Sequence, residues 1–282
     1  MTDTRLLWKP DGLEVNHSGP WAAEKYALLQ NYIDIFSTGM LNKWSERVYI
    51  DLYSGPGCTQ VRDSGEWLMG SPLLAMSVRD PFDKYIFCER DSQCLAALKA
   101  RKDSSFSRLN VSFVEGDCNQ RITDILRLVP PHSRSHSVLT FCFVDPFSLD
   151  LHFDTIKTLA ARFVDFLVLL ALDMDARRNL RNYLRPSNHK IDLFLGSNDW
   201  RSRWKLFSST DNSFQRFLAN EFERQMLLLG YKRYSKGNTK HISTRDETLP
   251  LYHLAFFSRH QRGYQFWEES LKYSSPQQSF EL

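Results

Sequence analysis

The stretch Val48-Tyr-Ile-Asp-Leu-Tyr-Ser-Gly-Pro-Gly57 decides the fold of this chain. Its first residues are apolar, β-branched or aromatic, which predicts a strand that is buried on both faces. The strand leads through Asp51 into a turn that contains Gly55 and Gly57. Glycines in such a turn let the backbone approach a ligand closely. The stretch therefore predicts a ligand-binding loop directly after a buried strand.

Further apolar runs follow this strand, and segments with helical spacing separate them. The predicted strands cover residues 48–53, 85–88, 111–114, 138–144 and 166–172. The predicted helices cover residues 21–36, 71–78, 92–102, 119–128, 153–162 and 214–229. Buried strands that alternate with helices predict a parallel sheet covered on each side. Two strand-like segments near the end, 231–244 and 251–258, predict a closing antiparallel hairpin.

The composition excludes several protein classes. The chain has 282 residues, of which 42% are hydrophobic and 24% are charged, as in globular proteins. No apolar run reaches the roughly 18 to 20 residues that span a bilayer, and the first residues do not form a secretion signal. We therefore expect a cytoplasmic protein without a membrane partner. The five cysteines are odd in number and form no C-x-x-C pair, so we expect reduced thiols and no metal site.

Charge is unevenly distributed along the chain. Residues 1–150 hold 16 Lys and Arg against 19 Asp and Glu, a net charge of −3, whereas residues 151–282 hold 20 against 14, a net charge of +6. A basic second half favours an acidic partner such as nucleic acid. The candidate contacts in the basic segment 173–210 are Arg177, Arg178, Arg181, Arg185, Arg201 and Arg203. Aromatic residues between these charges favour a base-stacking platform; they are Tyr183, Trp200, Trp204 and Phe207. The alternative interpretation is a solvated surface.

Acidic residues lie at or just beyond the ends of four consecutive predicted strands: Asp51, Glu89, Asp117 and Asp145. Ligands of open α/β sheets bind beyond the carboxyl ends of the strands, so we expect these side chains to surround one ligand. Asp51 can receive an ammonium group, and Glu89 can accept from two ribose hydroxyls. Asp117, which we prefer to Glu115, can accept from an adenine amine. Taken singly, each acid could instead cap a helix or lie in a solvated loop.

The glycine turn argues against a dinucleotide. A dinucleotide site has the pattern G-x-G-x-x-G running straight into a helix, whose N-terminus receives the pyrophosphate. Here Pro56 separates the two glycines, and a loop over residues 58–70 precedes the next predicted helix. The turn therefore favours a ligand with an amino-acid end, and a nicotinamide-dependent oxidoreductase is disfavoured.

Segments from nearly the whole chain also carry a family resemblance. They are Trp21-x-x-x-Lys25 with Leu28, Leu29 and Tyr32; Tyr49-Ile-Asp-Leu-Tyr-Ser-Gly-Pro-Gly57; Gly70-Ser-Pro-Leu-Leu-Ala75; Glu89-Arg-Asp91; Gly116-Asp-Cys-Asn119; Asp145-Pro-Phe147; and Tyr252-His-Leu-Ala-Phe-Phe-Ser-Arg-His260 with Gly263 and Trp267. In these segments the chain resembles the three-Cys-motif partner family, a branch of the class I S-adenosylmethionine-dependent methyltransferase fold. It departs from the family at Leu52-Tyr-Ser54, where small or aromatic residues followed by Ala are usual.

The resemblance implies a Rossmann-like class I methyltransferase sandwich. Its α/β fold would have a mostly parallel seven-stranded sheet, a C-terminal antiparallel hairpin and a helical insert. The implied cofactor is S-adenosylmethionine, and its candidate ligands are Asp51, Tyr53, Gly55, Gly57, Glu89, Arg90, Asp117, Cys118 and Asp145. The family name refers to three cysteines of a radical-S-adenosylmethionine-like protein, which is an implied partner. We expect one domain over residues 1–282, divided into an N-terminal helical cover (1–44), a cofactor-binding core (45–172), a basic helical insert (173–229), and a closing hairpin with a C-terminal helix (230–282).

Asp145-Pro-Phe147 is similar to the Asp/Asn-Pro-Pro-aromatic turn of amino-methyltransferases, although it lacks the second proline. We predict that Asp145 orients an acceptor nitrogen and that Phe147 stacks on a planar ring. The alternative is a helix cap and a core residue. His260 could reach the same crevice or be a surface residue. Trp21 and Lys25 could cover the cofactor.

The function predicted from the sequence is S-adenosylmethionine-dependent methylation of a nitrogen, with nucleic acid as the favoured substrate. Two alternatives remain open: a non-catalytic or accessory module that binds the cofactor for assembly with a partner, and a peptide or protein methyltransferase. The acids at the strand ends favour cofactor binding over an empty scaffold, but a fold does not by itself establish turnover.

Overall fold

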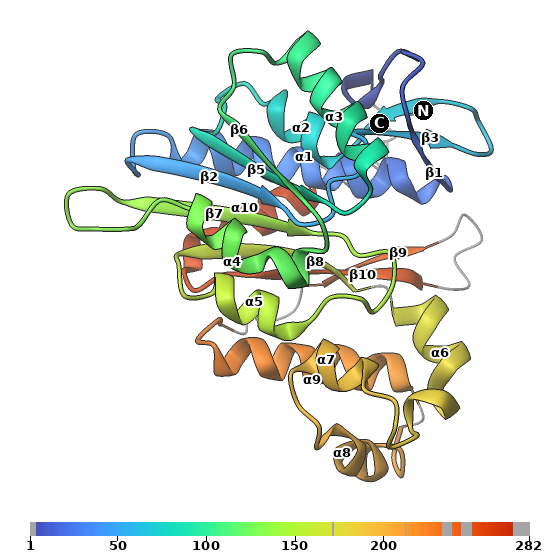
Figure 1. Cartoon of the computed structure of the whole chain (residues 1–282). Coiled ribbons are helices and arrows are strands. Elements are labelled where there is room, and N and C mark those ends of the chain that lie inside the picture. Colours follow the sequence, from blue (N-terminus) through green and yellow to red (C-terminus); the bar gives the residue numbers. More distant parts are fainter. Residues whose placement is uncertain (1–3, 171, 212, 233–238, 244–249, 273–282) are drawn as a thin grey trace, which may run out of the picture.

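The computed structural model describes residues 4–170, 172–211, 213–232, 239–243 and 250–272. A seven-stranded sheet runs through the molecule, and its strand order is β6-β5-β2-β7-β8-β10-β9 (Figure 1). The strands are β2 (Glu46–Asp51), β5 (Lys84–Glu89), β6 (Val111–Glu115), β7 (Val138–Val144), β8 (Val164–Leu170), β9 (Thr239–Ser243) and β10 (Pro250–Phe257).

The direction of one strand distinguishes this sheet from a fully parallel one. Pairs among β6, β5, β2, β7 and β8 are parallel, whereas β10 is antiparallel to both β8 and β9. The prediction of a mostly parallel sheet closed by an antiparallel hairpin is confirmed. The buried strand predicted around Val48 lies inside the sheet as β2, third in the strand order, with β5 and β7 on its two sides.

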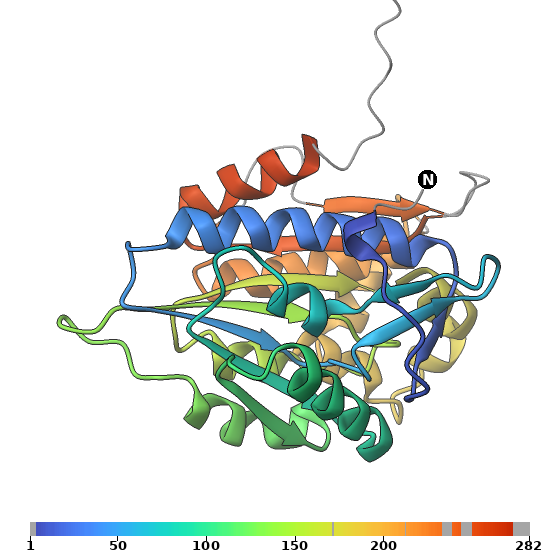
Figure 2. The same cartoon turned by 90° about the horizontal axis from the view of Figure 1, so that it is seen from above.

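Helices cover both faces of the sheet (Figure 2). One face packs against α1 (Trp21–Met40), α2 (Ser71–Met76), α3 (Ser92–Ser105) and α10 (Gln261–Lys272). The other packs against α4 (Cys118–Leu128), α5 (Phe153–Leu159), α7 (Lys190–Leu195) and α9 (Phe214–Leu228). The remaining helices of the basic insert are α6 (Leu172–Tyr183) and α8 (Trp200–Phe207). Within the described ranges, no helix is both long and apolar enough to span a membrane.

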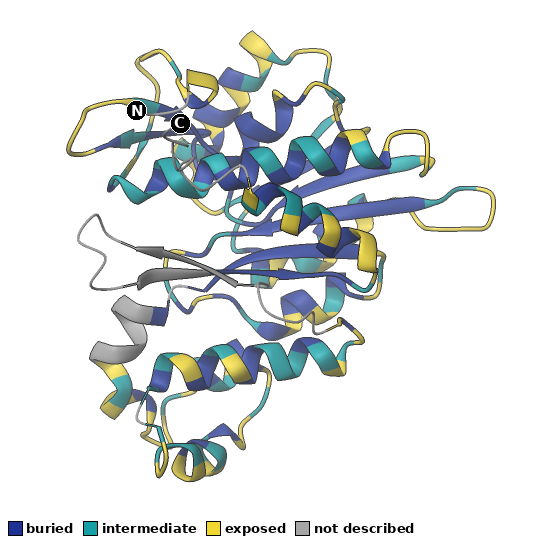
Figure 3. Ribbon diagram, turned by 180° about the vertical axis from the view of Figure 1, so that it is seen from behind, coloured by how far each residue is buried: buried dark blue, intermediate teal, exposed yellow. Residues whose placement is uncertain are grey.

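Side-chain alternation along the strands explains the two helical layers. All seven residues of β7 are buried. Phe141 and Phe143 face the layer that contains α1, whereas Cys142 and Val144 face the layer that contains α4. Because consecutive side chains of a strand point to opposite faces, a continuously apolar strand supplies both cores at once. The burial pattern in Figure 3 follows this arrangement, with buried strands between half-exposed helices.

The segment that follows the glycine turn contains structure that the sequence did not predict. Residues expected to form a plain loop instead form β3 (Cys58–Val61) and β4 (Trp67–Met69), and β1 (Asn16–Ser18) pairs with β3. This small three-stranded sheet and the short helix η1 (Thr4–Leu6) lie beside α1. The strands are three or four residues long, which is too short for a clear alternation pattern.

The core between α1 and the sheet contains two tyrosines whose hydroxyls differ in their bonding. The Tyr85 hydroxyl accepts from the Phe82 amide at 2.9 Å and donates to the Ala75 carbonyl at 3.3 Å. The Tyr32 hydroxyl is buried and has no hydrogen-bond partner in the described part of the chain. A buried polar group without a partner lowers stability because its desolvation is not compensated.

These tyrosines give a matched test of the core. Tyr85→Phe leaves the buried Phe82 amide unpaired, and we expect it to lower the free energy of unfolding by about 1–3 kcal/mol. Tyr32→Phe removes only the unpaired hydroxyl, so we expect no loss and a gain of up to about 1 kcal/mol. Urea unfolding followed by circular dichroism measures both changes. Equal destabilisation by the two substitutions would contradict this account.

Candidate functional site

The register of the sheet brings four acidic residues to one edge. Asp51 is the last residue of β2 and pairs with Phe87 of β5 and Phe143 of β7. Glu89 and Asp145 therefore lie two positions further along the neighbouring strands. On β6, Glu115 pairs with Glu89, so Asp117 follows at the same edge. Parallel strands all end on this side, as the sequence predicts.

Asp51 is the most deeply buried of these acids. Its side chain has no solvent exposure. Oδ1 accepts from the Tyr53 amide at 3.2 Å, whereas Oδ2 has no hydrogen-bond partner among the described residues. Burial raises the pKa of Asp51 to about 7, against the opposing effects of the Ser71 hydroxyl and the Tyr53 amide, and nearby Asp145 and Glu89 raise it further. A buried carboxylate whose only donors are the Tyr53 amide and the nearby Ser71 hydroxyl suits a cationic ligand group.

Glu89 is held in a fixed orientation by the backbone. Its Oε2 accepts from the Gly55 amide and its Oε1 accepts from the Asp91 amide, both at 2.8 Å. Each carboxylate oxygen can accept a second hydrogen bond, so two acceptors remain available for a pair of hydroxyls. Neighbouring Arg90 is exposed. The Glu89 geometry thus fits a ribose, and the Gly55 contact ties it to the glycine turn.

Asp117 performs the helix-capping role that was its alternative interpretation. It is the N-cap of α4, and its Oδ1 accepts from the Asn119 amide at 2.8 Å. The cap uses this oxygen and leaves Oδ2 to accept from a ligand. The adjacent Cys118 is buried, and burial raises the pKa of its thiol to about 12. The buried Tyr53 hydroxyl has no hydrogen-bond partner in the described residues.

The glycine turn is shaped by protein contacts. Gly55 and Gly57 have φ angles of +60° and +92°, which favour glycine over other residues. A Cβ on Gly57 would lie 3.0 Å from Leu98, and one on Gly55 would lie 2.7 Å from Asn16. The buried Arg101 adds to this packing by donating to the Pro56 carbonyl at 2.6 Å. The N-terminal segment and α3 thus hold the turn in place before any ligand binds.

Lys25 of α1 forms an ion pair with Asp145. Lys25 Nζ lies 2.6 Å from Asp145 Oδ2, and the two side chains are only 12% and 17% exposed. The sequence predicted that Lys25 covers the cofactor, but it gave no sign of this pairing. Tyr26 anchors the same helical turn, because its hydroxyl lies 3.0 Å from the Thr59 hydroxyl. α1 therefore contributes a fixed positive charge to the strand-end edge.

Phe147 is 87% exposed, so the alternative that it fills the core is wrong. It follows Asp145 by two residues in the loop after β7. Asn119 fixes that loop, since its Nδ2 donates to the Asp150 carbonyl and its Oδ1 accepts from the His152 amide and the Thr155 hydroxyl. Sequence reasoning did not single out this role of Asn119. An Asn one residue after a helix start is the only signal that could have indicated it.

Of the two interpretations of His260, the structure supports the surface residue and not the one that reaches the acceptor crevice. His260 follows β10, which runs antiparallel to β8 and pairs Phe257 with Phe166 near the beginning of β8. His260 is therefore at the edge of the sheet opposite Asp145. It is exposed, and its Nδ1 accepts from the Arg262 amide at 3.1 Å.

Two of the arginines predicted to contact nucleic acid form hydrogen bonds and ion pairs within the protein instead. Arg201 donates to Asp192 at 2.6 Å and to the Tyr183 carbonyl at 3.1 Å. Arg203 forms ion pairs with Asp199 and, at 2.8 Å, with Glu221. Both guanidinium groups hold the insert together, so the structure does not support a phosphate-binding role for them. Arg181 and Arg185 are exposed, whereas the side chains of Arg177 and Arg178 lie outside the described part of the chain.

The predicted base-stacking platform is also wrong. Tyr183, Trp200 and Trp204 are buried, with exposures of 3%, 0% and 7%. Trp204 packs edge-on against Phe214 and Phe217. The insert extends the hydrophobic core on this face of the sheet, so its large aromatic residues are used for packing. In the sequence, charged residues lie between these aromatic residues, and this arrangement also occurs in nucleic-acid-binding surfaces.

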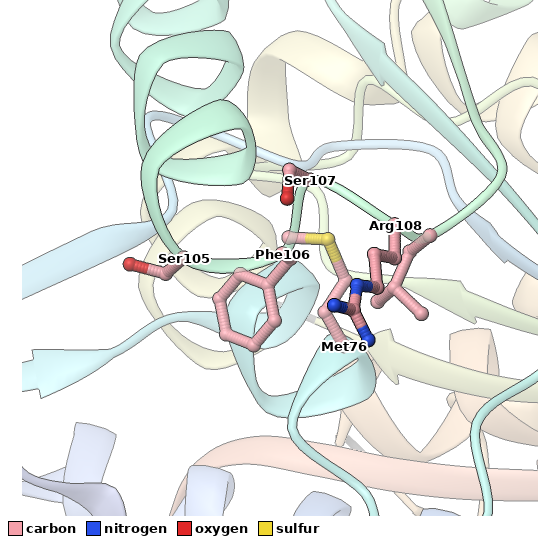
Figure 4. Close-up of a pocket in the computed structure, with 6 residues that line it drawn as sticks. Met76, Ser105, Phe106, Ser107 and Arg108 are labelled. Carbon is pink, nitrogen blue, oxygen red and sulfur yellow. The ribbon is translucent and has the colours of Figure 1, made fainter.

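A pocket with a volume of about 290 Å³ lies away from these acids. It is formed where α2 and α3 end and the chain leads into β6, at the amino ends of the strands. Figure 4 shows Met76 and Phe106 beside Arg108. The lining residues are Met76, Ser105, Phe106, Ser107, Arg108 and Leu109. None of the predicted site residues contributes to this pocket.

No protein-family model and no curated protein sequence matches this chain. Solved structures do resemble it. Protein LPL1258 from Legionella pneumophila str. Philadelphia 1 has a TM-score of 0.50 at 11% identity, over 88% of this chain and 91% of that chain. The strand order with its single reversed strand decides the assignment. The fold is that of the class I methyltransferases.

Other solved structures are similar at lower scores. Trm1 from Pyrococcus horikoshii, in complex with S-adenosyl-L-methionine, has a TM-score of 0.45 at 12% identity, over 94% of this chain and 62% of that chain. Magnesium protoporphyrin IX methyltransferase from Synechocystis PCC 6803, with bound SAH, has a TM-score of 0.42 at 11% identity, over 89% of this chain and 90% of that chain. At these identities the similarity concerns the fold alone.

The buried acids make the stability of the protein depend on pH. Burial raises the pKa of both Asp51 and Asp165 to about 7 from the ordinary 3.8. Between these values the folded state binds protons that the unfolded chain has released. The resulting stabilisation is complete below pH 3.8 and is lost as the pH rises through 7.

We therefore expect Asp51→Asn to stabilise the protein at pH 8 relative to the wild type. The gain is at most about 4 kcal/mol, at roughly 1.4 kcal/mol for each unit of pKa shift. At pH 4 the two proteins should differ little, because both side chains are then uncharged. Urea unfolding at pH 4, 6 and 8 measures the difference. A constant difference across this range would contradict the raised pKa.

Proposed function

We propose that this protein is an S-adenosylmethionine-dependent methyltransferase that methylates a nitrogen atom on nucleic acid. The observation that carries the proposal is Asp51, a wholly buried carboxylate at the end of the interior strand β2 with Oδ2 unpaired among the described residues. A buried carboxylate is costly unless a cation or a donor compensates it. An ammonium group such as that of an amino acid would supply both.

The side chains around Asp51 fit the rest of the cofactor. Glu89 would accept from the ribose hydroxyls through the acceptor positions that its two backbone contacts leave available. Asp117 would accept from the adenine amine, with Tyr53 and Cys118 lining the same region. When bound, S-adenosylmethionine supplies a methyl group on a positively charged sulfur. The protein then has mainly to position the acceptor in line with that methyl group.

Asp145 and Phe147 are the candidate acceptor residues. Asp145 would accept a hydrogen bond from the acceptor nitrogen and orient its lone pair. Phe147 presents an aromatic ring that is 87% exposed, two residues from this carboxylate. An exposed ring beside a half-buried hydrogen-bond acceptor suits a planar group that stacks while its amine is held. These properties favour a nucleic-acid base as the acceptor.

Binding of S-adenosylmethionine and S-adenosylhomocysteine tests the cofactor site. We expect Asp51→Asn to weaken binding about 10- to 100-fold, because a charge-assisted hydrogen bond is lost. Asp165→Asn is the matched control, since Asp165 is also a buried acid, 9% exposed, with a pKa also raised to about 7, but lies near the beginning of β8. Calorimetry at pH 7.5 measures both. No binding by the wild-type protein, or equal loss in the two variants, would exclude this site.

The exposed arginines of α6 and the turn after it carry the nucleic-acid part of the proposal. We expect the double change Arg181→Ala and Arg185→Ala to weaken binding of a single-stranded oligonucleotide. The slope of log affinity against log salt concentration should fall in magnitude by up to about 2. The control removes two exposed arginines outside the insert, by Arg79→Ala and Arg127→Ala. Fluorescence anisotropy at 50 and 200 mM salt measures the affinity. Equal effects of the two double changes would show that Arg181 and Arg185 do not form the nucleic-acid contact.

A second candidate function is supported by the Lys25–Asp145 ion pair. An ammonium group already occupies one oxygen of the acid that would hold the acceptor. This favours an accessory module that binds the cofactor without transferring the methyl group, for assembly with a partner such as the three-cysteine protein implied by the family resemblance. Transfer of labelled methyl from S-adenosylmethionine to RNA, DNA or protein of a cell extract distinguishes the two. Label in protein alone would indicate a peptide or protein methyltransferase.

A further inference from the structure

Lys25 is fixed where an acceptor would approach Asp145. Its ammonium lies 2.6 Å from Oδ2, and neither side chain is more than 17% exposed. The ammonium also lies 4.7 Å from the centre of the Tyr26 ring. Tyr26 itself is buried and held by Thr59. Because α1 is packed against the sheet along its length, the backbone of Lys25 is held beside this edge.

The Lys25–Asp145 ion pair carries no net charge of its own. Lys25 neutralises the carboxylate of Asp145, and Oδ1 remains able to accept a hydrogen bond. A neutral amine can donate to Oδ1 at no electrostatic cost. A protonated amine would instead bring a second positive charge close to Lys25 in a partly buried site, where like charges repel strongly. An aspartate without Lys25 would bind both neutral and protonated amines. The ion pair therefore favours the neutral amine over the protonated one.

We propose that Lys25 makes the acceptor site select an uncharged nitrogen, such as the amine of a nucleic-acid base, over the protonated amine of a lysine side chain. This rests on the proposed function, and it identifies the acceptor class of that site. In such a transfer the nitrogen lone pair forms the bond to the methyl carbon. The carbon–sulfur bond breaks with its electron pair going to sulfur, and the methylated nitrogen releases one proton to water. Lys25 is a positioning and specificity residue in this scheme.

Two cofactor analogues test the charge selection without a known acceptor. Sinefungin carries a protonated amine in place of the methylated sulfur, directed toward the acceptor, whereas S-adenosylhomocysteine is uncharged there. The measurement is the ratio of their dissociation constants by calorimetry. We expect Lys25→Met to raise the preference for sinefungin at least about tenfold, since an unpaired carboxylate then faces the amine. Lys25→Arg keeps the charge and should keep the wild-type ratio, and Asp145→Asn should lower the preference.

The outcomes separate this inference from the proposed function. Lack of binding of either analogue to the wild-type protein refutes the proposed function itself. A ratio for Lys25→Met within twofold of the wild type, with S-adenosylhomocysteine still bound, refutes the charge selection by Lys25 but not the proposed function. Lys25→Gln serves as a second neutral variant in case the methionine variant does not fold. Loss of S-adenosylhomocysteine binding in both neutral variants would also refute it, because Lys25 would then be a cofactor ligand.

Discussion

The burial of the Asp51 carboxylate at the end of the interior strand β2 is the constraint on which the candidate site depends. β2 is paired on both sides, so Asp51 is enclosed by β5, β7 and the glycine turn. A slip of one residue in this register would turn Asp51 to the other face and move every core residue of the strand with it. The packing of Tyr49 and Ile50 into opposite cores therefore also determines where Asp51 points.

The long helix α1 connects the stability of the fold to the chemistry of the site. Its C-terminal half packs Tyr32 and Phe36 against an aromatic cluster that includes Phe141, Phe256 and Trp267. Its first turns carry Lys25 to the strand-end edge. Because a helix is stiff, the packing at one end positions the charge at the other. The reversed strand β10 contributes to this arrangement, since it is followed by α10, which packs on α1.

In the basic insert, arginine and aromatic residues that could bind a ligand are used for hydrogen bonds and packing within the protein. A guanidinium group matches carboxylates and carbonyls as well as it matches phosphates. Around the short helices α7 and α8, carbonyl groups need donors, and Arg201 supplies them. The neighbouring tryptophans supply the apolar core. Sequence spacing alone cannot separate these uses, because it does not show which side of a short helix faces the rest of the protein.

The sequence by itself determined the layers, the parallel sheet, its closing hairpin and the edge at which Asp51, Glu89 and Asp145 meet. Those features follow from local periodicity and from the rule that parallel strands end on the same side. Only the tertiary structure decided that Lys25 pairs with Asp145, that Arg201 bonds within the protein, and that His260 lies on the opposite edge. Each of these depends on contacts between segments far apart in the chain, and neither composition nor spacing encodes such contacts.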